Sequence, residues 1–508
     1  MTTDKLLSID ELGEKVASAK AEGKKVVHCH GVFDLLHIGH IKHFEEAQSF
    51  GDLLVVTATA DNYVNKGPNR PAFTIDLRLQ ALAALETVDY VAESRWPSAV
   101  EVINLIKPHV YCKGPDFKNQ SDDITGKIVE EENAVKAVGG EIQYTSDITF
   151  SSSNLLNRFT EVFSKTQKSF IDKLKTQHSF EEILGKIDAL KEIKVLVIGE
   201  TIIDQYVLCE ALGKSGKEPV LVLRDMETVQ YAGGAAAIVR HLSDFCGEIS
   251  LLSMLGEDGE HEDFIKQSLT ETVSTNFIYK IGSPTILKKR FVEHINKSKV
   301  LGVYSVNDEL FHGDNEAQFE KLVEKLIPQY DLVIVSDYGH GMISKNIAKY
   351  ITEKASFMAL NAQINAANIG YHTMDKYKCV DCVIINETEL RHELREKQGA
   401  LEPLIKELAQ KLESSYIVVT RGSDGATLYH RKMDEFFLCP AFASKVVDKI
   451  GAGDAMLALI SVFLFNDNTP DLSLLLGSLA AAQSVETLGN SVPVAKTLLL
   501  KTIQHTLK

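Results

Sequence analysis

The chain has 508 residues, which is too long for one hydrophobic core and predicts two or three domains. Its hydrophobic content of 44% and charged content of 24% are typical of soluble globular proteins. The formal net charge of -16 argues against a nucleic-acid-binding protein, since neutralising phosphates requires a basic surface. No apolar run reaches the roughly 18 to 20 residues of a membrane helix, and the N-terminus shows no secretory signal. Seven scattered cysteines suit a reducing compartment. We therefore expect a cytoplasmic protein without membrane contact.

The first part of the chain alternates strands and helices. Residues 1–24 are interpreted as a helical lead-in. Strands are expected at residues 25–29, 53–60, 89–93 and 109–114, and helices at 41–50, 77–88 and 100–107. Such alternation is typical of a parallel, doubly wound sheet. The sequence therefore predicts a Rossmann-like α/β domain over residues 25–160.

The pattern changes after this domain. Residues 161–193 are charged and helical, and we interpret them as a linker. A second α/β domain is expected over residues 194–508, with strands at 194–207, 330–339, 379–386 and 414–422 and a long helix after Lys449. The β-rich stretch 206–232 predicts a small strand-built lid inserted into this domain.

The first chemical motif is HGVFDLLHIGHIKHFEEA, residues 30–47. A helix N-terminus exposes unpaired N–H groups and a positive dipole, and is a ready site for an anion. Gly39 allows a phosphate to approach the backbone closely. His37 and His40 lie three residues apart on the first turn, where both can donate hydrogen bonds to phosphate oxygens that gain charge. Lys42 adds a positive charge. These residues predict a phosphate-handling site.

A metal site is the alternative interpretation of the histidines. His28 and His30 would point to one face of a strand, as in some metal sites. Apart from Asp34, however, no acidic residue has a metal-like spacing to them. We expect His28 and His43 to be scaffold residues.

GVFDLLHIGH followed by FGDLLVVTATAD resembles the nucleotidyltransferases of the cytidylyltransferase-like superfamily. The resemblance implies that Phe33, Gly39 and Lys42 lie at the nucleotide phosphates and that Asp34 contacts the substrate. It places Arg78 on the phosphate side, nominates Lys113, and puts Ser151, Ser152 and Ser153 at the start of a helix against the phosphates. The implied reaction is attack by a phosphorylated substrate on the α-phosphate of ATP or CTP, with Mg²⁺ and release of pyrophosphate.

The second chemical motif is VVDKIGAGDAMLALI, residues 446–460. Gly451, Ala452 and Gly453 would direct successive backbone N–H groups at a phosphoryl group at the start of a helix. Asp454 lies on the first turn, where it can accept a proton from a substrate hydroxyl. The alternative is a helix cap made of small residues.

This part of the chain resembles the ribokinase-like, or PfkB, sugar kinases. YAGGAAAIVRHL resembles their di-glycine motif, which implies substrate contacts for Gly233 and Gly234, and Asp204 is the expected ligand of a sugar hydroxyl. INETEL nominates Asn386 and Glu389 for indirect Mg²⁺ and phosphate binding. VTRGSDGATLY implies nucleotide contacts for Thr420, Gly422 and Gly425. Ala237, Lys449 and Ile450 depart from the family pattern, so the sugar pocket is not standard. Asp337 is either an active-site residue or a turn residue.

Together, the two resemblances are similar to the bifunctional heptose-phosphate kinase/adenylyltransferases with the domain order reversed. They imply a kinase that uses ATP to phosphorylate a sugar or sugar phosphate, and a transferase that couples a sugar 1-phosphate to ATP or CTP. The alternatives are a cytidylyltransferase for a polyol or sugar phosphate whose kinase-like domain only binds or regulates, and an assembly scaffold with two vestigial sites. Because the lid of ribokinase-like enzymes often pairs subunits, a homodimer is expected.

Overall fold

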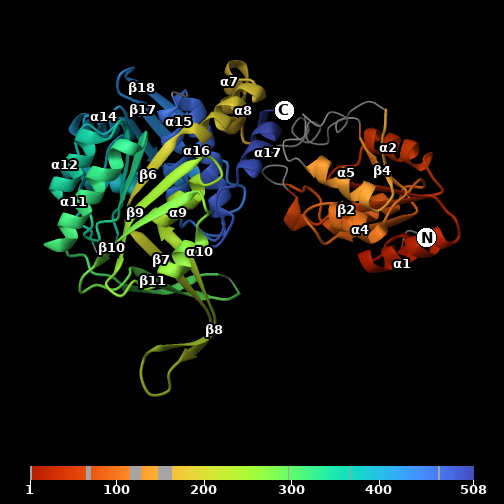
Figure 1. Ribbon diagram of the computed structural model, residues 1–508, viewed down its shortest axis with the longest axis horizontal. Coiled ribbons are helices and arrows are strands. Elements are labelled where there is room, and N and C mark those ends of the chain that lie inside the picture. The colour runs from red at the N-terminus through yellow and green to blue at the C-terminus, as the bar shows by residue number, and fades with distance from the viewer. Residues whose placement is uncertain are drawn as a thin grey trace. The chain divides into compact units, whose positions relative to one another are not determined.

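The computed structural model describes residues 3–64, 70–114, 127–146, 163–295, 297–365, 368–466 and 469–507. The chain forms two compact units, one of Met1–Lys165 with Leu500–Lys508 and the other of Thr166–Leu499 (Figure 1). Each unit contains a largely parallel sheet with helices, which confirms the α/β fold class. Within the described residues, no helix has both the length and the apolar character needed to cross a membrane.

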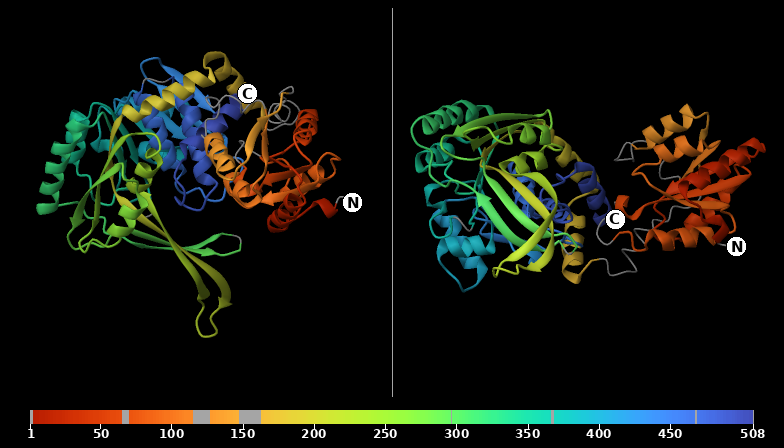
Figure 2. Two further views of the ribbon diagram at one scale, coloured as in Figure 1. Left: turned by 45° about the vertical axis from the view of Figure 1, so that its right-hand side comes forward. Right: turned by 90° about the horizontal axis from the view of Figure 1, so that it is seen from below.

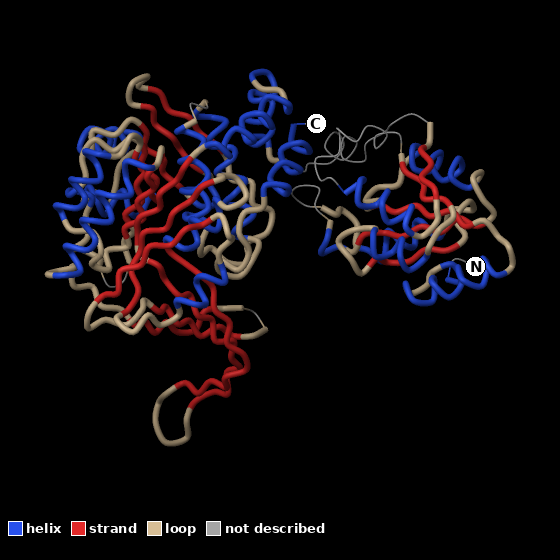
Figure 3. Tube along the Cα trace, viewed as in Figure 1, coloured by secondary structure: helices blue, strands red, loops and turns tan. Residues whose placement is uncertain are grey.

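The first unit is built on a five-stranded parallel sheet in the order β3-β2-β1-β4-β5. Its elements are α1 (Ile9–Ala21), β1 (Val26–Gly31), α2 (Ile38–Gln48), β2 (Leu53–Thr59), α3 (Ile75–Ala83), β3 (Tyr90–Ser94), α4 (Val100–Ile106), β4 (Val110–Lys113), α5 (Lys127–Ala137) and β5 (Glu141–Tyr144). All seven residues of β2 are buried, as its continuous apolar run predicts. Figure 3 shows helices and strands of this unit interleaved along the chain.

The topology of this sheet marks one end of β1 as a binding position. The chain leaves β1 for β2 on one side and returns, after β3, to β4 on the other side. Ligands of open α/β sheets bind at such a switch point, beyond the carboxyl ends of the strands. The loop between β1 and α2 begins there.

The second unit is built on a nine-stranded sheet in the order β10-β9-β6-β13-β14-β15-β16-β17-β18. Neighbours from β10 to β16 are parallel, and β17 and β18 extend the sheet in antiparallel pairing. The strands are β6 (Lys194–Gly199), β9 (Glu248–Gly256), β10 (Val273–Lys280), β13 (Leu332–Asp337), β14 (Met358–Ala362), β15 (Cys382–Asn386), β16 (Tyr416–Thr420), β17 (Ala426–His430) and β18 (Glu435–Cys439).

The helices of this unit follow its strands. They are α8 (Phe180–Ala189), α9 (Ala235–Leu242), α10 (Glu262–Ser268), α11 (Asp314–Leu326), α12 (Lys345–Lys354), α13 (Glu387–Leu394), α14 (Leu401–Lys411), α15 (Ala452–Phe465) and α16 (Pro470–Val485); α7 (Lys165–Gln177) and α17 (Lys496–Leu507) begin or end at its boundaries. Every residue of α15 from Ala455 to Leu464 is buried. A helix that is apolar on all sides belongs in the core of a large domain, and this one brings the GAGD motif to its N-terminal end.

A separate four-stranded sheet in the order β12-β11-β7-β8 forms the lid. It contains β7 (Thr201–Lys214), β8 (Leu221–Gly234), β11 (Leu287–Glu293) and β12 (Lys299–Ser305), and the tip of the β7–β8 hairpin extends away from the large sheet (Figure 2). The lid is therefore larger than the insert expected from residues 206–232. The two further strands were missed because β11 (LKKRFVE) is rich in charge and β12 is exposed throughout.

The segment expected to be a linker packs on the second unit. Gln167 of α7 donates a hydrogen bond to the carbonyl of Ala441 at 2.6 Å. His178, between α7 and α8, contacts the hydroxyl of Thr469 at 3.1 Å. The compact unit thus begins at Thr166, because a charged, amphipathic helix pair covers part of its surface.

Candidate active sites

The HxGH motif forms the start of α2 in the first unit. His37 is the N-cap, in an extended conformation, and its Nδ1 accepts a hydrogen bond from the backbone N–H of Gly39 at 3.1 Å. The centroids of the His37 and His40 rings lie 4.0 Å apart, with 30° between the ring planes. Both imidazoles therefore stand together at a helix N-terminus, as the motif predicts.

Phe33 packs against His40, one member of this histidine pair. Its backbone has a positive φ of 49°, which is uncommon for a residue with a side chain. This turn places the ring 5.5 Å from His40 and 5.3 Å from Phe44. Phe33 is buried, so the structure gives it a packing contact with His40.

Asp34 and Arg78 hold the neighbouring loops together, which differs from the direct ligand contacts expected from the sequence. Asp34 is buried, pairs with Arg70 at 3.0 Å, and accepts hydrogen bonds from the N–H groups of Ala72 and Phe73. Both of its carboxylate oxygens are thus engaged within the protein.

The guanidinium of Arg78 is also buried. It donates to the carbonyls of Val32 at 2.5 Å, Thr59 at 2.8 Å and Phe73 at 3.0 Å, and it pairs with Asp61 at 2.5 Å. Arg78 therefore ties the loops after β1 and β2 to α3. Sequence reasoning could not separate this positioning role from a phosphate contact, because both use an arginine at the same edge of the sheet.

The two lysines of the predicted site differ in environment. Lys113, at the end of β4, is nearly buried and pairs with Glu131 at 2.6 Å. Lys42 pairs with Glu45 at 2.6 Å on the exposed side of α2. Ser151, Ser152 and Ser153 lie outside the described residues, so their phosphate contacts stay a prediction.

His28 and His30 are held by threonines of the neighbouring strand. Nε2 of His28 lies 2.8 Å and Nδ1 of His30 lies 2.9 Å from the hydroxyl of Thr57. Burial, with a smaller contribution from the charge of Lys113, lowers the pKa of His28 to about 3. In the described part of the chain, neither residue belongs to a cluster of three possible metal ligands, so the metal interpretation of this pair has no support.

The GAGD motif forms the start of α15 in the second unit. Gly451 is the N-cap, with a φ of 91° that favours glycine. A Cβ atom on Gly451 would overlap Oδ1 of Asn490, whereas a Cβ atom on Gly453 would meet nothing within 4 Å. Space is therefore open above the first-turn N–H groups, where a phosphoryl group can bind.

Asp454 is placed to act as a base in this site. The hydroxyl of Tyr338 donates a hydrogen bond to its Oδ1 at 2.8 Å. Burial chiefly raises the pKa of Asp454 to about 6, while the bond from Tyr338 opposes this shift and the charge of Asp204 adds to it. A carboxylate with this pKa is largely ionised at neutral pH, as a general base must be.

Asp204 lies on β7, where the lid joins the site. Its carboxylate pairs with Arg290 of β11 and is nearly buried. A Cβ atom on Gly233 would overlap Oδ2 of Asp204, so the absence of a side chain at Gly233 lets the carboxylate approach β8. Gly234 has a φ of 61° at the N-terminus of α9. The two glycines thus shape the backbone beside Asp204.

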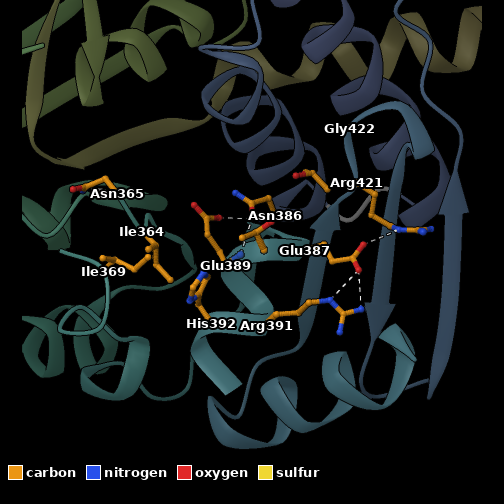
Figure 4. Close-up of a pocket in the computed structure, with 12 residues that line it drawn as sticks. Ile364, Asn365, Ile369, Asn386, Glu387, Glu389, Arg391, His392, Arg421 and Gly422 are labelled. Atoms are coloured by element: carbon orange, nitrogen blue, oxygen red, sulfur yellow. Dashed lines mark hydrogen bonds and ion pairs between the residues drawn. The ribbon is translucent and has the colours of Figure 1, made fainter. Parts of the chain in front are cut away.

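A cavity of about 630 Å³ lies at the ends of β15 and β16 (Figure 4). It brings together four predicted nucleotide-site residues from β15, α13, β16 and the turn after β16: Asn386, Glu389, Thr420 and Gly422. Gly425 lies outside its lining and forms a turn with a φ of 85°, in which a Cβ atom would overlap the carbonyl of Cys439.

The second unit matches a known family. Residues 192–497, more than half of the 508 residues, match the model described as pfkB family carbohydrate kinase. The chain belongs to the pfkB family of carbohydrate kinases. Residues 28–169 match the model described as cytidylyltransferase-like. The enzyme thus joins a carbohydrate-kinase domain to a nucleotidyltransferase-type domain.

Curated relatives carry one shared name. The bifunctional protein HldE of Aliarcobacter butzleri is 39% identical over 157 residues, which are 30% of this chain and 31% of that protein. HldE of Koribacter versatilis is 26% identical over 316 residues, which are 61% of this chain and 63% of that protein. The chain therefore spans less than two thirds of the length of these relatives.

Solved structures of Escherichia coli phosphofructokinase-2 resemble the pfkB domain. The complex with potassium has a TM-score of 0.51 at 12% identity, and the complex with substrates and products has a TM-score of 0.50 at 14% identity. Each match covers 62% of this chain and 100% of that chain. At such identity the likeness shows the fold alone.

The residues of the pfkB domain suit Mg²⁺ near the nucleotide. Asn386 caps α13, and its Oδ1 accepts a hydrogen bond from the backbone N–H of Glu389 at 2.8 Å. In return, the backbone N–H of Asn386 donates to Oε2 of Glu389 at 2.9 Å. Burial chiefly raises the pKa of Glu389 to about 7. Oxygen ligands of this kind are those that Mg²⁺ prefers, and a nearby dication would keep the Glu389 carboxylate ionised. Because the two side chains also cap the helix, contact through water fits them best.

Sequence reasoning missed two residues of the pfkB site. Lys288 of β11 is nearly buried, and its ammonium lies 5.5 Å from the ring centroid of Tyr338 and 5.8 Å from that of Tyr304. Within the described residues this ammonium makes no hydrogen bond or ion pair, although its charge interacts with Asp204 and Asp454. The alternation of side chains along LKKRF would have placed Lys288 on the same face of the strand as Arg290, but only if residues 287–293 had been predicted as a strand.

Asn490 is the second missed residue. It is buried beside Gly451, and its interaction with Asp454 lowers the pKa of that carboxyl. Asp337, by contrast, is held within the core by Lys376 at 2.6 Å and Tyr377 at 2.7 Å, so it is a structural residue.

Proposed function

We propose that the chain is a bifunctional enzyme of nucleotide-sugar synthesis. Its pfkB domain transfers the γ-phosphoryl group of ATP to a sugar or sugar phosphate, heptose-like by the resemblance described above. Its cytidylyltransferase-like domain couples a sugar 1-phosphate to ATP or CTP and releases pyrophosphate. The observation that carries the proposal is the placement of a half-buried carboxylate, Asp454, on the first turn of a helix with an open N-terminus, in the same chain as the paired histidines of the HxGH motif.

In the kinase reaction, Asp204 orients the substrate hydroxyl and Asp454 accepts its proton. The hydroxyl oxygen then attacks the γ-phosphorus, the bond to ADP breaks, and the proton stays on Asp454. Backbone N–H groups of Ala452, Gly453 and Asp454 stabilise the charge on the transferred group. When bound, Mg²⁺ supplies positive charge to the nucleotide phosphates.

A phosphorylated sugar is the preferred substrate class in this proposal. Lys288 supports it, because an ammonium without an acceptor in the described residues lies near both site carboxylates. A phosphate on the substrate would supply that acceptor. A neutral sugar would offer no anionic partner to this ammonium, whose charged form burial disfavours by lowering the pKa of Lys288.

In the transferase reaction, an oxygen of the sugar 1-phosphate attacks the α-phosphorus of the nucleotide, and the bond to pyrophosphate breaks. No protein nucleophile is needed. His37 and His40 donate hydrogen bonds to oxygens that gain charge, and Gly39 leaves room for them. Phe33 holds the ring of His40 in place. The choice between ATP and CTP defines the product, and we propose both as candidates.

We also propose that the lid pairs two copies of the chain. Its exposed apolar side chains support this: Leu212, Val220, Leu221, Val222, Met226, Val300, Leu301, Val303 and Tyr304. Large exposed apolar patches are typical of interfaces. Light scattering should give the mass of a dimer, and a monomer whose mass is unchanged by Leu301→Lys would contradict this part of the proposal.

Product analysis tests the proposed function. The chain is incubated with Mg²⁺, ATP or CTP, and a panel of sugar phosphates and sugar 1-phosphates, and the products are identified by ³¹P NMR. A new sugar phosphate ester and a new pyrophosphate diester support the two activities. A diester formed from polyol phosphates and CTP, without any kinase product, would favour a cytidylyltransferase with a binding-only kinase domain.

A further inference from the structure

A cluster of possible metal ligands in the first unit includes His43, which follows His40 by one turn on α2. One possible ligand atom from each of Cys29, His43 and Cys112 lies within 4.8 Å of the others. The three residues come from different elements, β1, α2 and β4. None of them takes part in the proposed transferase chemistry, so the cluster calls for its own explanation.

The two thiols are placed together by the sheet. Cys29 and Cys112 are register partners in the parallel pair β1–β4, so their side chains lie on the same face. Both are fully buried, at 0% and 1% exposure. Buried cysteines alone can serve as small apolar residues. The half-buried imidazole of His43 differs from such a case, because it brings a third possible metal ligand within 4.8 Å of the two thiols.

His43 is held in a ligand-like orientation. The hydroxyl of Thr145 donates to the carbonyl of Lys113 at 3.4 Å and lies 3.0 Å from Nδ1 of His43. With its proton directed at that carbonyl, the hydroxyl accepts from Nδ1–H, which leaves the lone pair of Nε2 available. Metal-binding histidines are commonly oriented by such a second hydrogen bond.

We propose that Cys29, His43 and Cys112 bind a zinc ion. Two thiolates and one imidazole form a ligand set that Zn²⁺ accepts, with ligand distances of about 2.0 to 2.3 Å and a fourth position for water. Binding releases the two thiol protons to solvent, and the two thiolate charges balance the dication. The ion would join α2 to β1 and β4. Its ligand His43 follows His40 by three residues, and its ligand Cys112 directly precedes Lys113. It would therefore fix the phosphate-binding helix without taking part in the reaction.

Metal analysis of the full chain tests the proposal. Protein purified without chelator is compared with His43→Gln, Cys112→Ser and the control Cys382→Ser, which changes a buried cysteine of β15 in the second unit. We expect one zinc per chain in the wild type and the control, and loss of zinc in the other two variants. Reloading chelator-treated wild type with Co²⁺ should give a thiolate-to-cobalt charge-transfer band, absent from His43→Gln.

Zinc content and the cobalt absorption band do not depend on enzyme activity, so a negative result would overturn the zinc site without affecting the proposed function. If a variant does not fold, wild type stripped of metal provides the test, since adding Zn²⁺ alone should raise the thermal midpoint of the first unit. Equal zinc in the wild type and His43→Gln, or no cobalt band in the wild type, would overturn the proposal. A Cys29–Cys112 disulfide found by mass spectrometry in freshly purified protein would overturn it as well.

Discussion

The hydroxyl of Tyr338 donates a hydrogen bond of 2.8 Å to Oδ1 of Asp454 at the N-terminus of α15, where Tyr338 is buried and Asp454 is half-buried. The bond engages one carboxylate oxygen and stabilises its charged form. Burial acts in the opposite direction and dominates, which gives Asp454 a pKa of about 6. The balance leaves a base that is ionised at neutral pH yet able to hold a proton.

The kinase rate should therefore fall as the pH drops through about 6, because protonated Asp454 cannot accept the substrate proton. Tyr338→Phe removes a hydrogen bond that lowers the pKa of Asp454, so the fall in kinase rate should begin at a higher pH in this variant. Asp454→Asn should lower kcat by about 10²- to 10⁴-fold. ADP formation measured from pH 5 to 9 checks these outcomes. A profile that is the same in Tyr338→Phe and wild type would contradict the role of the bond.

Gly451 and Gly453 offer a matched pair of substitutions. Gly451→Ala should destabilise the kinase domain by about 1 to 3 kcal/mol, because its φ of 91° and the nearby Asn490 leave no room for a methyl group. Gly453→Ala should fold normally, since its Cβ atom meets open space, but should lower kcat by crowding the phosphoryl group. Urea unfolding and ADP assays separate the two effects. Full kinase activity in Gly453→Ala would argue against phosphoryl binding at this helix end.

Lys288 should act on substrates that carry a phosphate. Lys288→Met keeps most of the apolar stem and removes the charge, so we expect kcat/KM for a sugar phosphate to fall by about 10- to 100-fold, the size of a charged hydrogen bond. Lys289→Met is the control, because alternate residues of a strand face opposite sides. Steady-state kinetics with a sugar and with the corresponding sugar phosphate should show the fall in kcat/KM only for the sugar phosphate. An equal loss for both would place Lys288 at the transferred phosphoryl group instead.

Arg78→Lys should destabilise the first unit by about 2 to 4 kcal/mol. A lysine cannot reproduce the fork that binds three carbonyls and Asp61, and those acceptors would be left partly unsatisfied. Thermal unfolding should show a lower midpoint for the first unit and an unchanged second unit. Lys42→Met, on the exposed side of α2, serves as the control. If Arg78→Lys lost transferase activity at full stability, the arginine would contact the nucleotide directly.

Much of the fold could be predicted because buried parallel strands leave a strong signal. LLVVTAT and YIVVT are rich in apolar and β-branched residues, and their strands lie inside the sheets. The lid strands β11 and β12 could not be predicted in the same way, since exposed strands need no apolar run. The pairing of β11 with β7 depends on residues about 85 positions earlier in the chain, as in Lys288 opposite Asp204, and β12 pairs in turn with β11.

The candidate sites show the same division. Features that the backbone determines, such as the open start of the helix at Gly453, could be predicted from the motifs, because glycines and helix ends have fixed physical roles. The hydrogen-bond and ion-pair partners of the site side chains could not be predicted from the motifs. Asp34 and Arg78 turn inward to loop N–H and carbonyl groups, and Lys288 enters from a distant strand. Both outcomes are decided by tertiary contacts that spacing along the chain does not encode.

The central claim is that one chain carries two separate reactions. The most direct measurement follows ADP and pyrophosphate simultaneously in wild type, His40→Ala and Asp454→Asn, with the substrates identified by product analysis. We expect the wild type to form both products, His40→Ala to lose pyrophosphate by about 10²- to 10³-fold while keeping ADP, and Asp454→Asn to show the reverse. Loss of both products in either folded variant, or pyrophosphate release unaffected by His40→Ala, would contradict the account.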